Sequence, residues 1–269
     1  MPLFKYGKTQ DLIKAIQNLT VRFTPADELN DPFEMLPDSK VVETQEFFEL
    51  AKRQFISRSR RKGATKSDEE LGATFLKGYP GDLGREKRIA SHALKTTRSL
   101  NRVLCLSKLP PCDPKALLMW AHYAENHSGI VLEFDDAHEW VRSHDFEKGQ
   151  SRDRKDVLYQ GKRTGWNGLI PRDEFLYTKS ECWAYEKEVR LLRFFGDKDF
   201  LPNTVDSLVM FPPQLLRSVT LGVNNTAEDQ VLHAITARPE LAHVKLRKAE
   251  IHLDEYKLIL IDHPIRPAV

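Results

Sequence analysis

The chain has 269 residues, of which 41% are hydrophobic, so it is long enough to bury one elaborated core. Its 41 Lys and Arg residues nearly balance 39 Asp and Glu residues, which argues against an overall field that attracts polyanions or membranes. Three cysteines without a C-x-x-C pair argue against a disulfide framework and a zinc site, and neither a signal peptide nor a transmembrane run is visible. We therefore expect a single cytoplasmic α+β domain over residues 1–269, with no membrane partner.

The N-terminal segment alternates strand, helix and strand. We predict a strand over Leu3–Tyr6, a helix over Gln10–Ile16 and a second strand over Thr20–Thr24, which Pro25 is expected to end. The segment P-A-D-E-L-N-D-P-F-E that follows is dense in turn-forming residues. It predicts a polar loop with a fixed backbone conformation.

Two basic helices are predicted next. The first, over Val41–Lys62, has apolar residues at a four-residue spacing, and the second covers Asp82–Arg102. A linker rich in Gly, Ser and Lys is expected between them. Together they resemble an insertion into the domain at about residues 41–101.

The charge of this insertion differs from that of the rest of the chain. Between Lys52 and Arg102 the sequence has 14 basic residues and 5 acidic ones, a local net charge of +9. Such a stretch suits a polyanionic partner, but it equally suits a pair of solvated helices. Both interpretations remain open at this point.

The segment after the insertion predicts another strand and a well-signalled helix. The strand covers Arg102–Ser107, and the helix begins with Asp113 as its N-cap and Pro114 at its first position. The helix is expected to end near Ser128 and Gly129.

The remaining elements are mostly strands. Further strands are predicted over I-V-L-E-F, V-L-Y-Q-G, E-V-R-L-L-R-F, S-V-T-L-G-V, V-K-L-R-K-A-E-I-H-L and Y-K-L-I-L-I-D, with a helix over T-A-E-D-Q-V-L-H-A-I. Strands and helices mix without regular βαβ alternation. This favours an α+β fold with a mostly antiparallel or split sheet.

The segment W-A-Y-E-K-E-V-R carries the densest set of chemically capable side chains. Glu186 and Glu188 are two residues apart at the start of a predicted strand, which places both carboxylates on one face. Trp183 and Tyr185 stand beside them and are suited to stack on a ring while the acids bind hydroxyl groups. A solvated strand end, with Trp183 as a core anchor, is the alternative.

A second cluster lies on the helix after Pro114. Trp120, Tyr123 and His127 share one helical face, and His122 lies on a neighbouring face. The five-residue spacing of the two histidines misses the four-residue pairing of a helical zinc motif, so we expect no metal.

A third cluster combines the end of the first strand with the polar loop. Lys5, Tyr6 and Gly7 close the strand, and Asn30 and Asp31 lie in the loop. Gly7 permits close backbone approach to a ligand, although a glycine after a strand is commonly just a turn. The sequence contains no P-loop, no G-x-G-x-x-G, no G-x-S-x-G and no kinase signature.

Several motifs in fixed order resemble the bacterial domain-of-unknown-function family 2971. They are K-Y-G, R-F-T-P-A-D-E-L-N-D-P-F-E, L-C-L-S, L-M-W-A-H-Y-A-E-N-H-S-G-I-V-L-E-F and W-A-Y-E-K-E-V-R. The resemblance covers nearly the whole chain.

The order of the motifs also resembles the ADP-ribosyltransferase superfamily. That resemblance implies a split antiparallel or mixed sheet with a helical insertion, and a site built from three strands. Its three positions are Tyr6 with Gly7, then Ser107 or Tyr123, then Glu188 preceded by Glu186. The departure is at the first position, where Tyr6 or Lys5 stands in place of His or Arg.

The same resemblance implies roles in cleaving the bond between nicotinamide and ribose in NAD. Glu188 would hold the ribose hydroxyl and stabilise the oxocarbenium-like charge, and Glu186 would orient the acceptor or act as its base. Tyr6 and Tyr123 would stack on nicotinamide. The implied cofactor-binding residues are Lys5, Tyr6, Gly7, Asn30, Ser107, Trp120, His122, His127, Trp183 and Arg190. A salt bridge from Arg190 to Glu188 is the structural alternative.

The leading expectation is therefore a NAD-consuming ADP-ribosyltransferase-like enzyme. It would be a toxin or phage-defence effector that modifies nucleic acid or protein, with an antitoxin or inhibitor as a further partner. A second hypothesis is a metal-dependent hydrolase or nuclease that uses Glu186, Glu188, Asp31 and His127. A third is a non-enzymatic binding module whose recognition surface is formed by Trp120, Tyr123, Trp183 and Tyr185.

Overall fold

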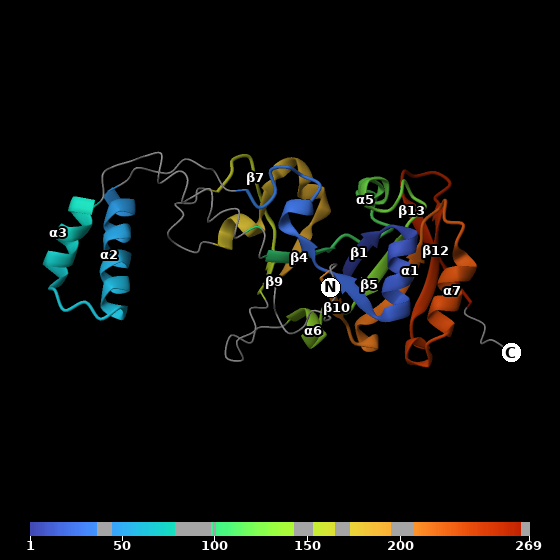
Figure 1. Ribbon diagram of the computed structural model, residues 1–269. Coiled ribbons are helices and arrows are strands. Elements are labelled where there is room, and N and C mark those ends of the chain that lie inside the picture. The colour runs from blue at the N-terminus through green and yellow to red at the C-terminus, as the bar shows by residue number, and fades with distance from the viewer. Residues whose placement is uncertain are drawn as a thin grey trace.

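The computed structural model describes residues 1–36, 45–78, 98, 101–142, 153–164, 173–194 and 207–264 (Figure 1). Within these residues the strands are β1 (Leu3–Gly7), β2 (Thr20–Arg22), β3 (Thr24–Pro25), β4 (Asn101–Ser107), β5 (Ile130–Phe134), β6 (Asp153–Asp156), β7 (Leu158–Gln160), β8 (Thr178–Ser180), β9 (Glu188–Phe194), β10 (Leu208–Met210), β11 (Leu216–Leu221), β12 (Lys245–Ile251) and β13 (Leu258–His263). The α-helices are α1 (Thr9–Asn18), α2 (Gln45–Arg61), α3 (Asp68–Gly78), α5 (Ala116–Tyr123), α6 (Glu139–Arg142) and α7 (Glu228–Thr236). Short 3₁₀ helices are η1 (Ala26–Glu28), η2 (Asp173–Tyr177), η3 (Glu181–Glu186), η4 (Pro213–Leu215) and η5 (Pro239–Leu241). The predicted α+β class is confirmed.

The described strands form one nine-stranded sheet and two two-stranded sheets. The order of the large sheet is β13-β12-β11-β5-β1-β4-β9-β6, and β3 pairs with β4 beside this path. Strands β11 and β12 run parallel, whereas the other pairs of the large sheet in the described residues are antiparallel. The sheet is therefore mixed and mostly antiparallel, as the sequence predicts.

The large sheet is weakly joined in its middle. In the described residues β1 and β4 pair at one position, where Phe4 lies opposite Ser107. By contrast, β1 pairs with β5 along its whole length, and β4 does the same with β9. The sheet thus consists of two well-paired halves that meet between β1 and β4.

The two faces of the sheet are covered differently. Helices α1 and α7 cover one face (Figure 1), where Ile16 and Ile235 join a large core with Leu132 and Val219. Helix α5 packs on the other face, and its Trp120 belongs to a separate apolar cluster. The side chains of the candidate site lie on this second face, beside α5.

The N-terminal elements lie close to their predicted positions, with one correction. Thr20–Thr24 is not one strand, because β2 pairs with β10 whereas β3 pairs with β4, and the buried Phe23 lies between them. Pro25 belongs to β3 rather than ending a longer strand. A proline is tolerated there because β3 lies beside the main path of the sheet.

The insertion contains a helix that the sequence analysis placed in a linker. Helix α2 agrees with the predicted helix, but α3 follows it where a Gly, Ser and Lys-rich linker was expected. The missed signal is a capping box: the backbone N–H of Ser67 donates to Glu70, and the backbone N–H of Glu70 donates to Ser67 Oγ at 3.1 Å. The rings of Phe55 and Phe75 join the two helices with centroids 5.6 Å apart.

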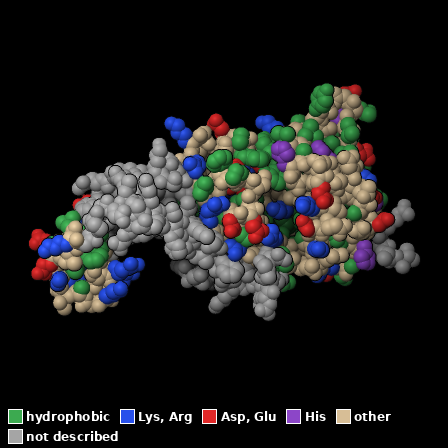
Figure 2. All heavy atoms as spheres, turned by 45° about the horizontal axis from the view of Figure 1, so that its top comes forward, with side chains coloured by type: hydrophobic (Ala, Val, Ile, Leu, Met, Phe, Trp, Pro, Cys, Tyr) green, Lys and Arg blue, Asp and Glu red, His purple; other side chains and the backbone are tan. Residues whose placement is uncertain are grey.

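The second predicted helix of the insertion, over Asp82–Arg102, lies mostly outside the described residues. Its last two positions, Asn101 and Arg102, are the first residues of β4 instead. Lys and Arg side chains gather on the α2–α3 pair at the left of Figure 2, in agreement with the local excess of positive charge.

Helix α5 is shorter than predicted. It ends at Tyr123, and Glu125, Asn126 and His127 then take left-handed backbone conformations with φ of 48°, 50° and 68°. The turn is tied to α1, because the backbone N–H of Thr9 donates to a Glu125 carboxylate oxygen at 2.8 Å. These contacts with distant elements end the helix before Ser128.

None of the helices in the described part of the chain is both long and apolar enough to cross a lipid bilayer.

Candidate functional site

The two glutamates of the E-x-E motif converge through a turn rather than through strand alternation. Glu186 is the last residue of η3, Lys187 takes a left-handed conformation with φ 45°, and Glu188 begins β9. The two carboxylates meet, as expected. They do so because of this turn, however, and not because alternate residues of one strand share a face. The Oγ atom of Ser107 fixes the turn, because it donates to the Glu186 carbonyl at 2.5 Å and accepts from the Leu109 backbone at 2.9 Å.

The two carboxylates belong to a buried ionic cluster, whose members are Glu34, Lys179, Glu186, Glu188 and Arg190. The Lys179 ammonium lies at its centre, 2.9 Å from Glu34, 2.7 Å from Glu186 and 3.3 Å from Glu188. Three buried carboxylates thus share one buried lysine. Such a group is stable only when each charge is paired and hydrogen-bonded.

Arg190 supplies the second positive charge of the ionic cluster. Its Nε donates to Glu188 at 2.7 Å, one Nη also contacts Glu34, and the other donates to the carbonyl of Leu176 at 2.7 Å. The side chain is fully buried, with 0% exposure. The expectation that Arg190 binds the cofactor is therefore wrong, and its alternative role as the salt-bridge partner of Glu188 is confirmed.

The pKa values of the two glutamates shift in opposite directions. Burial alone would raise the pKa of Glu188, but Arg190 and Lys179 outweigh it and hold that pKa below its usual range. Burial raises the pKa of Glu186, and Lys179 and the Tyr123 hydrogen bond only partly oppose this. Glu188 is thus ionised near neutral pH as the partner of two cations, whereas Glu186 is the more readily protonated carboxylate.

A partly exposed aromatic rim covers the ionic cluster, and it consists of Asn30, His122, Tyr123, Trp183 and Tyr185. The Tyr123 hydroxyl donates to Glu186 at 2.5 Å and accepts from the Asn30 amide at 3.4 Å. His122 Nδ1 lies 2.8 Å from the Tyr185 hydroxyl. These side chains are half-buried or exposed, so they offer rings and polar groups directly above Glu186.

Trp183 links the aromatic rim to the charges beneath it. The Lys179 ammonium lies 4.9 Å from the centroid of its ring, and the His122 ring packs edge-on at 6.0 Å. Trp183 is half-buried, so it is not the core anchor that the alternative interpretation required.

Three other predicted cofactor-binding residues, Tyr6, Trp120 and His127, lie outside the aromatic rim. Tyr6 is buried against Trp120, with ring centroids 5.6 Å apart, and its hydroxyl donates to the Leu109 carbonyl at 2.9 Å. Trp120 has 0% exposure and donates to the Pro111 carbonyl. His127 stacks on Trp120 at 6.5 Å, beyond the end of the helix. Tyr6 and Trp120 are core residues, so their predicted contacts with nicotinamide and cofactor are wrong.

The remaining residues of the first predicted position also have structural roles. Gly7 makes room for α1, since a Cβ there would lie 2.9 Å from the side chain of Leu12. The Lys5 ammonium donates to the Cys105 carbonyl at 3.2 Å and so bridges the two halves of the sheet where β1 and β4 diverge. Neither residue contacts the aromatic rim in the described structure.

The arrangement of the carboxylates does not suit a divalent metal ion. In the described residues no group of three His, Cys, Asp or Glu side chains is placed to hold one. The Lys179 ammonium occupies the space among Glu34, Glu186 and Glu188 where an ion would have to bind. Asp31 accepts a hydrogen bond from the Phe33 backbone of its own loop, so it does not join them.

Sequence reasoning missed three contributors to the site. Glu34 stands at the end of N-D-P-F-E, a motif noted only as a loop. Lys179 lies just before W-A-Y-E and carries no local signal of its own. Tyr159, on β7, accepts a hydrogen bond from the Glu188 backbone at 2.8 Å, which joins the short sheet of β7 and β8 to the start of β9.

Comparison with known proteins gives one match. The model of a family described as a protein of unknown function (DUF2971) matches residues 119–191, which include most of α5, the aromatic rim except Asn30, and the start of β9. This confirms the resemblance to that family over this segment. No curated protein and no solved structure matches the chain.

Proposed function

We propose that the protein is a NAD-dependent ADP-ribosyltransferase-like enzyme whose reaction takes place at the aromatic rim, above Glu186. The observation that carries the proposal is the convergence of Glu186 and Tyr123 at the surface end of the buried ionic cluster. The cluster stands at the end of β9, next to the place where the sheet opens between β1 and β4. This opening supports a split-sheet fold of the ADP-ribosyltransferase type.

Within this proposal the two glutamates exchange the roles expected from the sequence. Both oxygens of Glu188 are already taken, one by Arg190 Nε and the other by Lys179 and Arg190 Nη2, and its side chain is buried. Glu186 is buried as well, but only one of its oxygens bonds a buried cation, Lys179, and the other accepts from the hydroxyl of the partly exposed Tyr123. A ribose hydroxyl that replaces the Tyr123 hydroxyl would therefore meet Glu186, and Glu188 would position Lys179 behind it.

The chemistry follows from the charge that develops in the reaction. Breaking the bond between nicotinamide and ribose builds positive charge on the ribose, and a carboxylate fixed beside it stabilises that charge. The carboxylate must be ionised: burial raises the pKa of Glu186, and the Lys179 ammonium at 2.7 Å opposes that shift and so favours the ionised form. The nicotinamide or adenine ring would stack on Trp183 or Tyr185.

The acceptor is proposed to be nucleic acid or protein. Helix α2 offers exposed Arg58, Arg60 and Arg61 at its C-terminal end, although Arg60 pairs with Asp68 at 2.7 Å. This basic end would attract a polyanionic acceptor, with an affinity that falls as salt rises. Action as a toxin or phage-defence effector, restrained by an inhibitor partner, remains part of this proposal.

Release of nicotinamide from labelled NAD tests the proposal. Glu186→Gln is expected to lower the rate by about a hundredfold or more, as is typical when an electrostatic stabiliser is removed. Glu181→Gln makes the same change at an exposed position of η3 and is expected to keep the rate. Absence of nicotinamide release from the wild-type protein, or equal rates for both variants, would rule out this function.

A binding module is the second candidate, and one observation favours it. Lys179 and Arg190 together pair all three buried carboxylates, so the cluster has the form of a scaffold that holds the rim rigid. Trp120 is excluded from the recognition surface by its burial, but Tyr123, Trp183 and Tyr185 remain partly exposed. Tight NAD binding without nicotinamide release would favour this candidate over the enzyme.

A further inference from the structure

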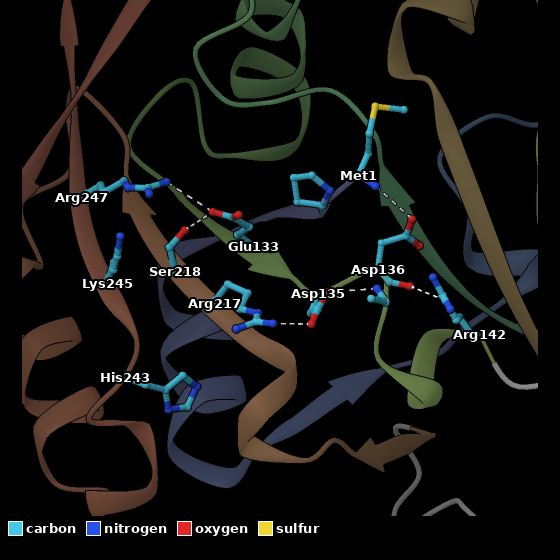
Figure 3. A pocket seen from close by; sticks show the side chains of 12 residues that line it. Met1, Glu133, Asp135, Asp136, Arg142, Arg217, Ser218, His243, Lys245 and Arg247 are labelled. Atoms are coloured by element: carbon cyan, nitrogen blue, oxygen red, sulfur yellow. Dashed lines mark hydrogen bonds and ion pairs between the residues drawn. The ribbon is translucent and has the colours of Figure 1, made fainter.

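A pocket of about 550 Å³ lies on the same face of the sheet as the ionic cluster but away from it (Figure 3). Across the sheet Glu188 lies opposite Ser107, Ser107 opposite Phe4, and Phe4 opposite Glu133, which lines the pocket. Three strand spacings therefore separate Glu188 from Glu133, roughly 14 Å. The pocket is a site distinct from the aromatic rim, and its size suits a small molecule.

The pocket is lined by charged side chains of both signs. The cations are Arg142, Arg217, Lys245 and Arg247, and the carboxylates are Glu133, Asp135 and Asp136. Figure 3 shows these side chains arranged around the hollow, with Lys245 and Arg247 on the β12 side.

The carboxylates are already paired with cations of the protein. Glu133 accepts from Ser218 Oγ at 2.5 Å and from Arg247 at 3.3 Å. Asp135 accepts from the Ala137 backbone at 2.9 Å and from Arg217 at 2.5 Å.

The third carboxylate, Asp136, pairs with Arg154 at 2.5 Å. Each of the three carboxylates thus has a cationic partner within the protein, with which a ligand cation would have to compete. This argues against a metal or an amine as the ligand.

The cations, in contrast, keep free donors. Among the described residues Lys245 makes no hydrogen bond or ion pair, so its three N–H donors are available. Arg142 donates to the backbone carbonyl of Asp136, and the Arg217 side chain, 55% exposed, uses one of its terminal nitrogens for Asp135. The unused hydrogen-bond donors of the pocket therefore belong to cationic side chains.

We propose that this pocket binds a small phosphorylated molecule, with Lys245 and Arg217 holding its phosphate oxygens. A phosphate group supplies several anionic acceptors at once, which matches a set of spare ammonium and guanidinium donors. A long nucleic-acid backbone suits the site less well, because paired carboxylates alternate with the cations around a concave surface. This inference does not depend on the proposed enzymatic function.

Calorimetric titration of the full chain with ribose 5-phosphate, at low salt, tests the proposal, and ribose is the uncharged comparison. We expect ribose 5-phosphate to bind and ribose not to bind. Lys245→Gln and Arg217→Gln are each expected to weaken binding about tenfold or more, since each removes a charged hydrogen-bond donor. Lys14→Gln, the same change at an exposed position of α1, is the matched control and is expected to keep the affinity.

Trp183→Ala, at the aromatic rim, is also expected to keep the affinity for ribose 5-phosphate, which assigns the binding to this pocket. The proposal is overturned if ribose 5-phosphate does not bind, if ribose binds equally well, or if Lys245→Gln and Lys14→Gln have the same affinity. Loss of binding in Trp183→Ala alone would likewise place the phosphate at the rim and overturn it.

Discussion

The hydroxyl group of Tyr123 lies 2.5 Å from a carboxylate oxygen of Glu186, and this hydrogen bond joins α5 to the end of η3. The two residues are 63 positions apart in the sequence. Glu186 is buried, whereas Tyr123 is partly exposed and also accepts from Asn30. The buried ionic cluster therefore reaches the surface at this pair.

Tyr123→Phe removes the hydrogen bond and keeps the ring. We expect the free energy of unfolding to fall by about 1.5–3 kcal/mol, because a hydrogen bond to a charged group contributes about that much and Glu186 is buried. Urea denaturation followed by circular dichroism measures the change. Tyr256→Phe, at a side chain that is 95% exposed, is the matched control and should leave the stability unchanged. Equal stability of Tyr123→Phe and the wild type would show that the bond is absent in solution.

Lys179→Met keeps the length of the side chain but removes the charge shared by three buried carboxylates. Arg190 would still pair with Glu34 and Glu188, but Glu186 would lose its cationic partner in the cluster. The free energy of unfolding is expected to fall by about 3–5 kcal/mol, the usual cost of leaving a buried charge uncompensated. Lys115→Met, at an exposed position before α5, serves as the control. A loss of less than about 1 kcal/mol in Lys179→Met would contradict a buried cluster.

The pH dependence of stability follows from Glu188. Its pKa is depressed in the folded protein from an ordinary value of 4.5 to about 2, with Arg190 and Lys179 outweighing burial. The folded state therefore binds fewer protons than the unfolded state in this range, so the stability from Glu188 is full above pH 4.5 and is lost as the pH falls toward 2. Urea midpoints measured between pH 7 and pH 3 should decline below about pH 4.5 in the wild type.

Glu188→Gln provides the comparison for this pH effect. The variant lacks the titrating carboxylate, so its stability should depend less steeply on acid than that of the wild type. The difference between the two proteins should be largest near neutral pH and shrink as the pH falls. A difference that grows in acid would mean that the folded-state pKa of Glu188 is raised instead.

Local patterns in the sequence predict the elements of this fold better than they predict the members of its site. The helical periodicity of α1 and the apolar strands of the large sheet are local signals, and the structure confirms them. The ion pair between Arg190 and Glu34 joins residues 156 positions apart, and no local pattern indicates it. No local pattern indicates Lys179 either: Glu186 and Glu188 are seven and nine positions away, and its third partner, Glu34, comes from the N-terminal loop.

Tyr6 illustrates a different limit. Strand alternation predicts that Tyr6 and Phe4 share a face, and both belong to the same apolar cluster. It does not predict that α5 will cover this face and seal Tyr6 against Trp120. A position that resembles a ligand-binding tyrosine in the sequence is therefore a core residue in the fold.

Substitutions of Trp120 in α5 and of Trp183 in η3 should affect stability and ligand binding differently. Trp120 is fully buried and donates to the Pro111 carbonyl, so Trp120→Ala is expected to cost about 3–5 kcal/mol of unfolding free energy. Trp183 is half-buried, and its described contacts are with Lys179, His122 and Tyr185. Trp183→Ala should therefore cost only about 1 kcal/mol.

The affinity for NAD should fall more in Trp183→Ala than in Trp120→Ala, the opposite of the order for stability. If a ring of NAD stacks on the aromatic rim, Trp183→Ala should weaken NAD binding by about tenfold, the effect of losing one stacking contact. Trp120→Ala, measured at a temperature where it remains folded, should bind NAD with nearly the wild-type affinity because its ring does not reach the rim. Unfolding by urea and NAD titration by calorimetry give the two readings for each variant. A Trp183→Ala protein with unchanged NAD affinity would exclude this ring from the NAD site, whatever its effect on stability.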